Sequence, residues 1–191
     1  GALWIYQWDR ERRTARLIYD VDSPELLQRF SLCNAAGEAL SRAARRWHIY
    51  YSVRTQDQKR NAGATSLIRR TRVPCVPRPL PLIDCNVQPW SIPAGPQRLL
   101  FLPDRLLVHE GRRIAAIPYT QLAVEALTSR FIEEESVPSD ATVVGSTWRF
   151  VNKSGGPDRR FNNNRQLPIL SYGEVSLRSS SGIEADTAPG H

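Results

Sequence analysis

The stretch "ATVVGSTWRFVNKSGGPDRRFNNNRQLPILSYGEVSLRS", residues 141–179, sets the architecture expected for the second half of the chain. Two runs rich in β-branched and aromatic residues, 141–151 and 166–179, have the pattern of strands. The run between them is rich in Gly, Pro and Asn, which are residues of turns. These features predict a β-hairpin. Tight hairpins use roughly two to five loop residues, and this connection is longer than twelve.

The connection, residues 151–168, has three possible roles. Its glycines and asparagines permit left-handed backbone, in which successive amides can form an anion-binding nest. Alternatively, Asp158 pairs with neighbouring arginines and the loop packs on itself around Phe161. The third role is catalysis. The cations of this run are Lys153, Arg159, Arg160 and Arg165.

The clearest helical signal lies at residues 24–46. Ser23 is a favourable N-cap and Pro24 suits the first helical position. Apolar or small residues recur at alternating steps of four and three, which places them on one helical face. Because Gly37 lies on that face, we expect another element to approach the helix closely there. The face comprises Leu26, Phe30, Cys33, Gly37, Leu40, Ala44 and Trp47.

Strand-like patterns occur in much of the remaining chain. Residues 3–8 and 15–20 predict a first hairpin, 47–53 a strand, and 98–118 three more strands. Residues 120–132 fit a strand or a helix equally well. The seven prolines of residues 74–96 exclude helix and favour extended backbone.

The fold predicted from these patterns is α+β. A strongly curved, mostly antiparallel sheet or small barrel, built from the second half, packs against the one long amphipathic helix. Three regions are expected. Residues 1–97 form a basic helix-plus-strands region with a Pro-rich connection, residues 98–180 a β-rich region, and residues 181–191 a disordered tail. One continuous domain is the alternative to the first two.

Charge and composition restrict the classes of function. The chain has 191 residues and a formal net charge of +7. The positive excess lies in residues 1–97, and Lys59 and Lys153 are the only lysines. Arginine makes forked contacts with phosphate or carboxylate, although a genome that favours arginine codons would give the same composition.

Several kinds of site are not expected. The three cysteines are scattered, which suits a reducing compartment and provides no paired metal ligands. Gly-rich nucleotide motifs are absent, so we expect no metal and no cofactor. The chain lacks an apolar run of about 18 residues and a signal-peptide pattern. A cytoplasmic protein without a membrane-spanning segment is therefore expected. Because the sequence contains no Met, it is expected to be a piece of something longer.

A second basic segment precedes the Pro-rich region. Together with Tyr50 and Tyr51, it has the charges and rings that a nucleic-acid backbone and its bases require. A solvated sheet edge would have the same composition. The predicted anion-binding residues of this segment are Arg54, Lys59, Arg60, Arg69, Arg70 and Arg72.

Catalysis has three candidate residues. Pro157-Asp158 followed by Glu174 is similar to the PD-(D/E)xK nuclease pattern, but Ser176 occupies the position that requires lysine. His109, at a turn, is a candidate general base. No serine lies in a GxSxG elbow.

Residues 99–128, "LLFLPDRLLVHEGRRIAAIPYTQLAVEALT", resemble the opening strands of bacterial pleckstrin-homology-like and GRAM-like domains. The resemblance extends over residues 98 to about 180. It implies a small barrel that binds lipids, peptides or protein partners without catalysis, and it assigns no ligand residue. "GGPDRRFNNNRQLP" also resembles a run in uncharacterised bacterial multidomain proteins, which implies no known activity.

The leading hypothesis is a non-catalytic binding module of a larger cytoplasmic bacterial protein. It would recognise nucleic acid or another phosphate-bearing ligand through the arginines of residues 54–72 and 159–165. A protein partner, or the remainder of a longer chain, is also expected. The alternatives are a nuclease or other hydrolase with an unrecognised site, and a structural or oligomerisation domain.

Overall fold

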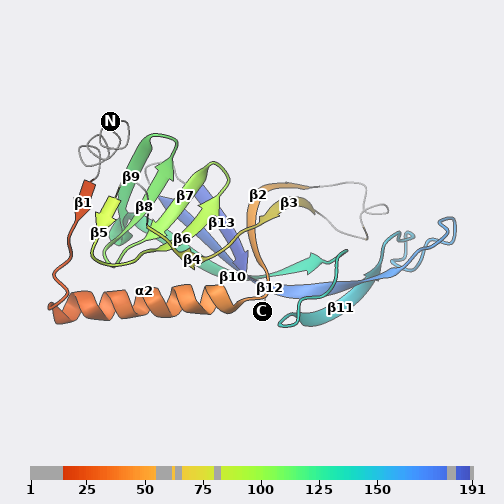
Figure 1. Ribbon diagram of the computed structural model, residues 1–191. Helices are drawn as coiled ribbons and strands as arrows, with labels where there is room; N and C mark the ends of the chain where they lie inside the picture. The colour runs from red at the N-terminus through yellow and green to blue at the C-terminus, as the bar shows by residue number, and fades with distance from the viewer. Residues whose placement is uncertain (1–14, 55–61, 63–65, 80–82, 180–183, 190–191) are drawn as a thin grey trace, which may run out of the picture. The chain divides into compact units, whose positions relative to one another are not determined.

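The computed structural model describes residues 15–54, 62, 66–79, 83–179 and 184–189 (Figure 1). The protein is mostly β, with 51% strand and 15% helix, and its sheets are open. The predicted α+β fold, a curved sheet or barrel packed on one long helix, is therefore wrong. The reason is that the strands form separate open sheets in two units rather than one curved sheet or barrel, and helix is only a small part of the structure. Parts of the Pro-rich segment also form strands, and α2 (Pro24–Arg42) is one element among many.

The chain divides into two compact units, each built from two separate segments. The first unit comprises residues 1–41 and 74–121, and the second comprises residues 42–73 and 122–191. The boundary predicted between residues 97 and 98 lies at the start of a strand of the first unit. The barrel-like region expected at residues 98–180 contributes to both units.

The first unit contains α2 and most of the short strands. These are β1 (Ala15–Leu17), β4 (Val76–Pro77), β5 (Ile83–Cys85), β6 (Trp90–Ala94), β7 (Gln97–Phe101), β8 (Arg105–Glu110) and β9 (Arg113–Pro118), followed by the 3-10 helix η1 (Tyr119–Gln121). Strands β4-β6-β7-β8-β9 form an antiparallel sheet in that order, and β1 pairs in parallel with β5. The strands predicted at residues 98–118 are confirmed. The predicted partner of residues 15–20, residues 3–8, lies outside the described residues.

The predicted close approach at Gly37 is confirmed. Gly37 is buried, and a Cβ atom at this position would lie 2.1 Å from the Trp90 ring. The Trp90 indole N–H also donates to Asn34 Oδ1 at 3.0 Å. The helix ends at Arg42, before the predicted residue 46, because Arg46 already begins a strand. Trp47 is therefore a strand residue and not part of the helical face.

The core of the first unit lies around the Leu102–Asp104 turn. Tyr119 OH donates to the Leu102 carbonyl at 2.6 Å, and Tyr19 OH donates to Asp104 Oδ1 at 2.6 Å. Burial raises the pKa of both tyrosines, so they remain protonated donors. The buried residues here are Ile83, Val87, Leu100, Leu102 and Leu107.

The second unit is a six-stranded antiparallel sheet. Its strands are β2 (Arg46–Arg54), β3 (Ser66–Arg72), β10 (Leu122–Ile132), β11 (Thr142–Trp148), β12 (Gln166–Ser179) and β13 (Glu184–Pro189). The order is β10-β12-β13-β2-β3, and β11 pairs with β12 beside this path. Residues 184–189 belong to the predicted tail, but they form β13 between β12 and β2.

The predicted hairpin at residues 141–179 is confirmed as β11 and β12, and residues 149–165 connect them. Trp47, Leu170 and Tyr172 form a buried cluster in this sheet. Within the described part of the chain, neither α2 nor η1 is long and apolar enough to cross a bilayer.

Candidate anion-binding site

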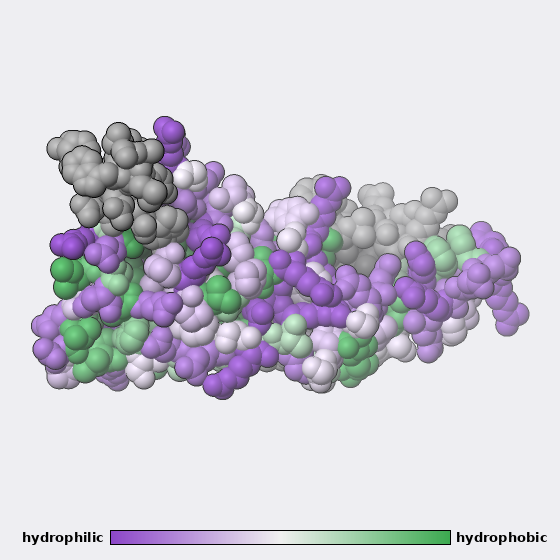
Figure 2. Space-filling model, viewed as in Figure 1, coloured by the Kyte–Doolittle hydropathy of each residue, from purple (hydrophilic) through white to green (hydrophobic). Residues whose placement is uncertain are grey.

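The loop that connects β11 and β12 is itself an ordered structure, and we call residues 149–165 the hairpin loop. It lies beyond the far ends of β11 and β12 (Figure 1). Arg149 N–H donates to the Arg165 carbonyl at 2.9 Å, and Val151 forms an isolated antiparallel bridge with Pro157. The hairpin ladder therefore continues into the loop, and residues 152–156 form its tip. Mostly hydrophilic residues cover this end of the hairpin (Figure 2).

Asn152 organises the tip. Its Oδ1 accepts the N–H groups of Ser154 at 3.0 Å and Gly156 at 2.9 Å, as well as the Ser154 hydroxyl at 2.8 Å. Gly155 adopts a φ of 81°, which favours glycine, and its N–H donates to the Asn152 carbonyl at 3.1 Å. The amides of Ser154, Gly155 and Gly156, which belong to the predicted nest, are thus bonded inside the loop. At this tip, side chains are therefore the candidate contacts for an anion.

Stacked rings and a paired asparagine hold the other half of the loop. The rings of Phe150 and Phe161 stack at 4.2 Å with an angle of 12°. Asn164 accepts from Phe150 N–H at 3.0 Å and donates to the Phe150 carbonyl at 2.7 Å. Phe161 packs against the loop as the self-packed alternative predicted.

Asp158 and Arg160 form a forked ion pair. The Arg160 Nε donates to Oδ1 at 2.9 Å and Nη2 donates to Oδ2 at 2.5 Å. The Asp158 side chain is 6% exposed, whereas that of Arg160 is 74% exposed. The hydrogen bond from Arg160 to Asp158 raises the pKa of the guanidinium, which stays charged. Among the described residues, only Asp158 engages this guanidinium, through its Nε–Nη2 edge, so the Nη1–Nη2 edge is directed away from the carboxylate.

An open depression of about 440 Å³ lies beside this pair, lined by Asn152, Lys153, Ser154, Asp158 and Arg160. Lys153 and Arg159 are exposed. Within the described residues, neither side chain has a hydrogen-bond or ion-pair partner. Of the predicted cations, Lys153 and Arg160 therefore come together at the depression, and Arg159 is the exposed residue that precedes Arg160 in the sequence.

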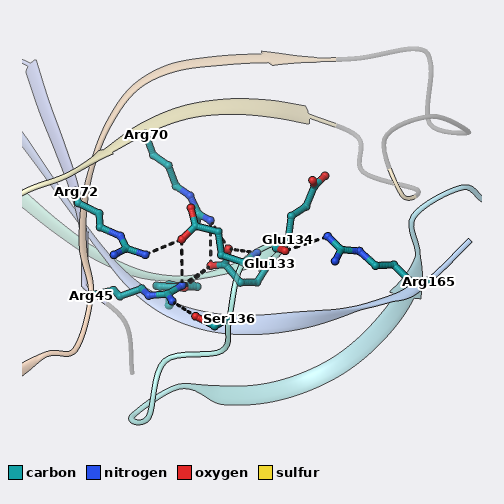
Figure 3. Close-up of polar contacts among 9 residues, drawn as sticks. Arg45, Arg70, Arg72, Glu133, Glu134, Ser136 and Arg165 are labelled. Carbon is teal, nitrogen blue, oxygen red and sulfur yellow. Dashed lines mark hydrogen bonds and ion pairs between the residues drawn. The ribbon is translucent and has the colours of Figure 1, made fainter. Parts of the chain in front are cut away.

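Two predicted arginines of β3, Arg70 and Arg72, lie beside acidic residues of the segment after β10 (Figure 3). We call Arg45, Arg70, Arg72, Glu133 and Glu135 the Glu133 cluster. Arg70 Nη2 donates to both Glu133 oxygens, at 2.9 and 3.0 Å, and the Glu133 side chain is fully buried. Tyr172 OH donates to Glu133 Oε2 at 3.1 Å. The Arg70 guanidinium lies 4.1 Å from the Trp47 ring centroid, which is the position of a cation–π contact.

Two further arginines complete the Glu133 cluster. Arg72 Nη2 donates to Glu135 Oε2 at 2.6 Å. Arg45 Nη2 donates to Ser136 Oγ at 2.7 Å, and its Nη1 lies 3.7 Å from a carboxylate oxygen of Glu133 and of Glu135. Three guanidiniums thus face two carboxylates. Most of the charge on these guanidiniums is therefore paired. Since Glu133 and Glu135 follow β10, Arg70 and Arg72 connect β3 to the segment after β10.

Arg165 belongs with this segment rather than with the depression. Its Nη2 donates to the Glu134 carbonyl at 3.1 Å (Figure 3). The contact ties the base of the hairpin loop to residues 133–136. The guanidiniums predicted to converge in one concavity are therefore divided between the Glu133 cluster and the depression.

The remaining predicted anion-binding residues contribute little evidence. Lys59 and Arg60 lie outside the described residues, and so does the side chain of Arg54, the last residue of β2. Arg69 lies in β3 and is exposed.

The three candidate catalytic residues each have their own surroundings within their unit. Asp158 is paired with Arg160, and Glu174 accepts a short hydrogen bond from Ser129 Oγ. His109 lies in β8 of the first unit. Among the residues with described positions, no group of three His, Cys, Asp or Glu side chains could hold a metal ion.

The residues that organise the Glu133 cluster and the tip of the hairpin loop were not predicted from the sequence. Glu133 and Glu135 anchor the arginines of β3, and Asn152 closes the loop tip. The run Glu133-Glu134-Glu135 was the available signal, because three successive acids in a chain of net positive charge are candidate partners for arginines.

No protein-family model matches the chain, and comparison with curated proteins and with solved structures finds no significant match.

Proposed function

We propose that the protein is a non-catalytic binding module that holds an anionic ligand at the hairpin loop. The observation that carries this proposal is the Asp158–Arg160 pair. Its carboxylate is buried, while the guanidinium remains 74% exposed. A buried carboxylate fixes an exposed cation in one position, which leaves less conformational entropy to be lost when a ligand binds.

The charges around Arg160 favour the same role. Lys153 lines the depression with Arg160, and Arg159, the residue before Arg160, is exposed. Together with the formal charge of +7 for the chain, these cations would attract anions from solution. The binding centre proposed here is the hairpin loop rather than residues 54–73, because Arg70 and Arg72 are engaged by carboxylates.

A catalytic role has weaker support. Asp158 neutralises Arg160, and Glu174 accepts from Ser129, so both candidate carboxylates have structural partners. A general base needs a position within hydrogen-bond reach of a reacting proton, and neither residue has a described catalytic partner.

The test is a titration with fluorescent single-stranded DNA at two salt concentrations. Binding should weaken as salt rises, because cations that contact phosphates release counterions. The variant K153A/R159A should bind more weakly, whereas the matched variant R112A/R113A removes two exposed arginines of the first unit and should bind like the wild type. Equal losses in both variants would refute a site at the loop. Incubation with Mg²⁺ should leave the DNA intact, and cleavage would favour the hydrolase alternative.

A further inference from the structure

We infer that the group bound at the hairpin loop is a phosphate, held on the outward edge of the Arg160 guanidinium, with Asp158 acting as the positioning residue. This inference rests on the proposed function and specifies the chemistry of its ligand. It requires a free forked edge, a matching charge and a rigid support for the arginine.

The free edge follows from the geometry of the ion pair. A guanidinium has five N–H donors in one plane, and Asp158 takes one donor from Nε and one from Nη2. The opposite edge retains one donor on Nη1 and one on Nη2, and these two point in parallel. Such an edge matches two oxygens of a phosphate, which a lysine ammonium cannot match in this way.

The cations around the depression favour phosphate over a simple carboxylate. Lys153 lines the depression together with Arg160, so a second cation is available beside the forked edge. A phosphate monoester has a charge of about −1.5 to −2 at neutral pH, and when two of its oxygens face the guanidinium edge another oxygen remains for Lys153. A carboxylate has only two oxygens, and both would be used at Arg160.

The support is rigid because Asp158 is bonded to the loop on both sides. Its carboxylate also accepts the Arg160 amide at 3.1 Å, and its own N–H donates to the Phe150 carbonyl at 3.1 Å. The ring stack of Phe150 and Phe161 joins the two segments that carry these contacts. The guanidinium plane is therefore fixed relative to the hairpin ladder before a ligand arrives.

The first test compares two lysine substitutions that preserve net charge. Isothermal titration with inorganic phosphate should show at least about tenfold weaker affinity for R160K, since the forked pair of charge-assisted bonds is lost. The matched variant R159K alters the neighbouring exposed arginine and should stay within about twofold of the wild type. Equal affinity of R160K and the wild type would overturn the inference.

The second test uses a substitution for which two explanations predict opposite signs. D158N raises the net charge by one, so a site governed by charge alone should bind phosphate more tightly. A site that needs a positioned guanidinium should bind it more weakly. The expected result is a loss of about fivefold or more, with the Phe161 ring signals in NMR spectra checking that the loop keeps its fold. Tighter binding by D158N would overturn the inference, and R160K remains decisive if D158N disturbs the loop.

A comparison of ligands distinguishes the possible sources of the phosphate group. It also distinguishes failure of the phosphate inference from failure of the proposed function. Inorganic phosphate represents a monoester group, an oligonucleotide without terminal phosphate represents diesters, and acetate represents carboxylates. Phosphate displaced equally well by acetate would contradict the inference. Suppose that anions bind the wild type, that K153A/R159A has a lower anion affinity and that R160K does not. The proposed function then stands and the phosphate inference fails. If no anion binds the wild type, both fail.

Discussion

The second unit contains two arrangements of arginine and buried carboxylate that differ in one respect. Glu133 and Asp158 have side-chain exposures of 0% and 6%, so both carboxylates lie inside the protein. Their partners differ, because Arg70 and Arg45 are 17% and 10% exposed while Arg160 is 74% exposed. In the Glu133 cluster, the guanidiniums of Arg70 and Arg45 are largely taken into the fold. At the hairpin loop only one edge is used.

This difference shows why a count of arginines does not locate a binding site. A buried guanidinium between carboxylates and an aromatic ring is a structural group, since a ligand would have to displace existing contacts. An exposed guanidinium that is fixed from behind is available for recognition. Ionic contacts in the Glu133 cluster should therefore affect mainly stability, and those at the loop mainly binding.

The largest expected effect is on the Glu133 side of this comparison. E133Q leaves the buried Arg70 and Arg45 without their central negative charge, and losing one partner of a buried ion pair typically costs about 3–5 kcal/mol. Denaturant unfolding should show this loss, while phosphate affinity of the folded protein should be unchanged. The matched variant is E134Q, because Glu134 contributes its carbonyl to Arg165 and its side chain is exposed. Similar unfolding curves for both variants would contradict the structural role of Glu133.

A third pair, Asp104 and Arg105 in the first unit, has a guanidinium of intermediate exposure, 42%, and sharpens the comparison by its pH dependence. Burial alone would raise the pKa of Asp104, but hydrogen bonds from Arg105 and Tyr19 lower it below the ordinary 3.8. A carboxyl group whose pKa is lower in the folded state stabilises the fold above the unfolded pKa, and this stability is lost as the pH falls through the folded pKa.

The corresponding variant is D104N. At pH 7 its free energy of unfolding should be about 1.5–3 kcal/mol lower than that of the wild type, because two hydrogen bonds to a charged acceptor are weakened. As the pH falls below the ordinary 3.8 the difference should shrink, since the wild-type carboxyl becomes protonated. Thermal melts at several pH values measure it, and a difference independent of pH would show that the carboxylate charge does not matter.

A smaller effect is expected from the ring stack that supports the loop. F161L keeps an apolar side chain but removes the stacking with Phe150, which is worth about 0.5–1.5 kcal/mol in similar pairs. The melting temperature should fall slightly, and hydrogen exchange should increase at Asp158 and Phe150 before it increases in β12. Uniform exchange changes over the sheet would argue that the loop is not a separate supporting structure.

The smallest effect should come from the exposed member of the Glu133 cluster. Arg72 and Glu135 are 56% and 54% exposed, and surface pairs of this kind contribute about 0.2–1 kcal/mol. A double-mutant cycle with R72A and E135A should give a coupling in that range, reduced by salt. A coupling as large as the effect of E133Q would mean that burial does not decide how much an ion pair contributes to stability.

Local patterns predicted much of the chain's connectivity. The β11–β12 hairpin, the start of α2 and the contact at Gly37 follow from residue periodicity, capping and the small side chain of glycine. The α+β prediction failed because local patterns indicate strands but not how distant strands pair. Residues 97–118 and 122–179 contribute to two separate open sheets, and not to one curved sheet or barrel.

The candidate site was predictable only where its contacts are local. Asp158 and Arg160 are two residues apart, and their pairing was one of the expected alternatives. Arg70 and Glu133 are 63 residues apart, so no local rule connects them. The sequence could not separate structural cations from exposed ones for this reason.

The position of β13 has a consequence for biosynthesis. Residues 184–189 insert between β12 and β2, which are separated by more than a hundred residues in the chain. On the ribosome, the β2–β3 hairpin emerges early but cannot join the rest of its sheet until these late residues have left the exit tunnel. We therefore expect nascent chains stalled before residue 184 to leave the facing edges of β12 and β2 unpaired, which makes them targets for chaperones.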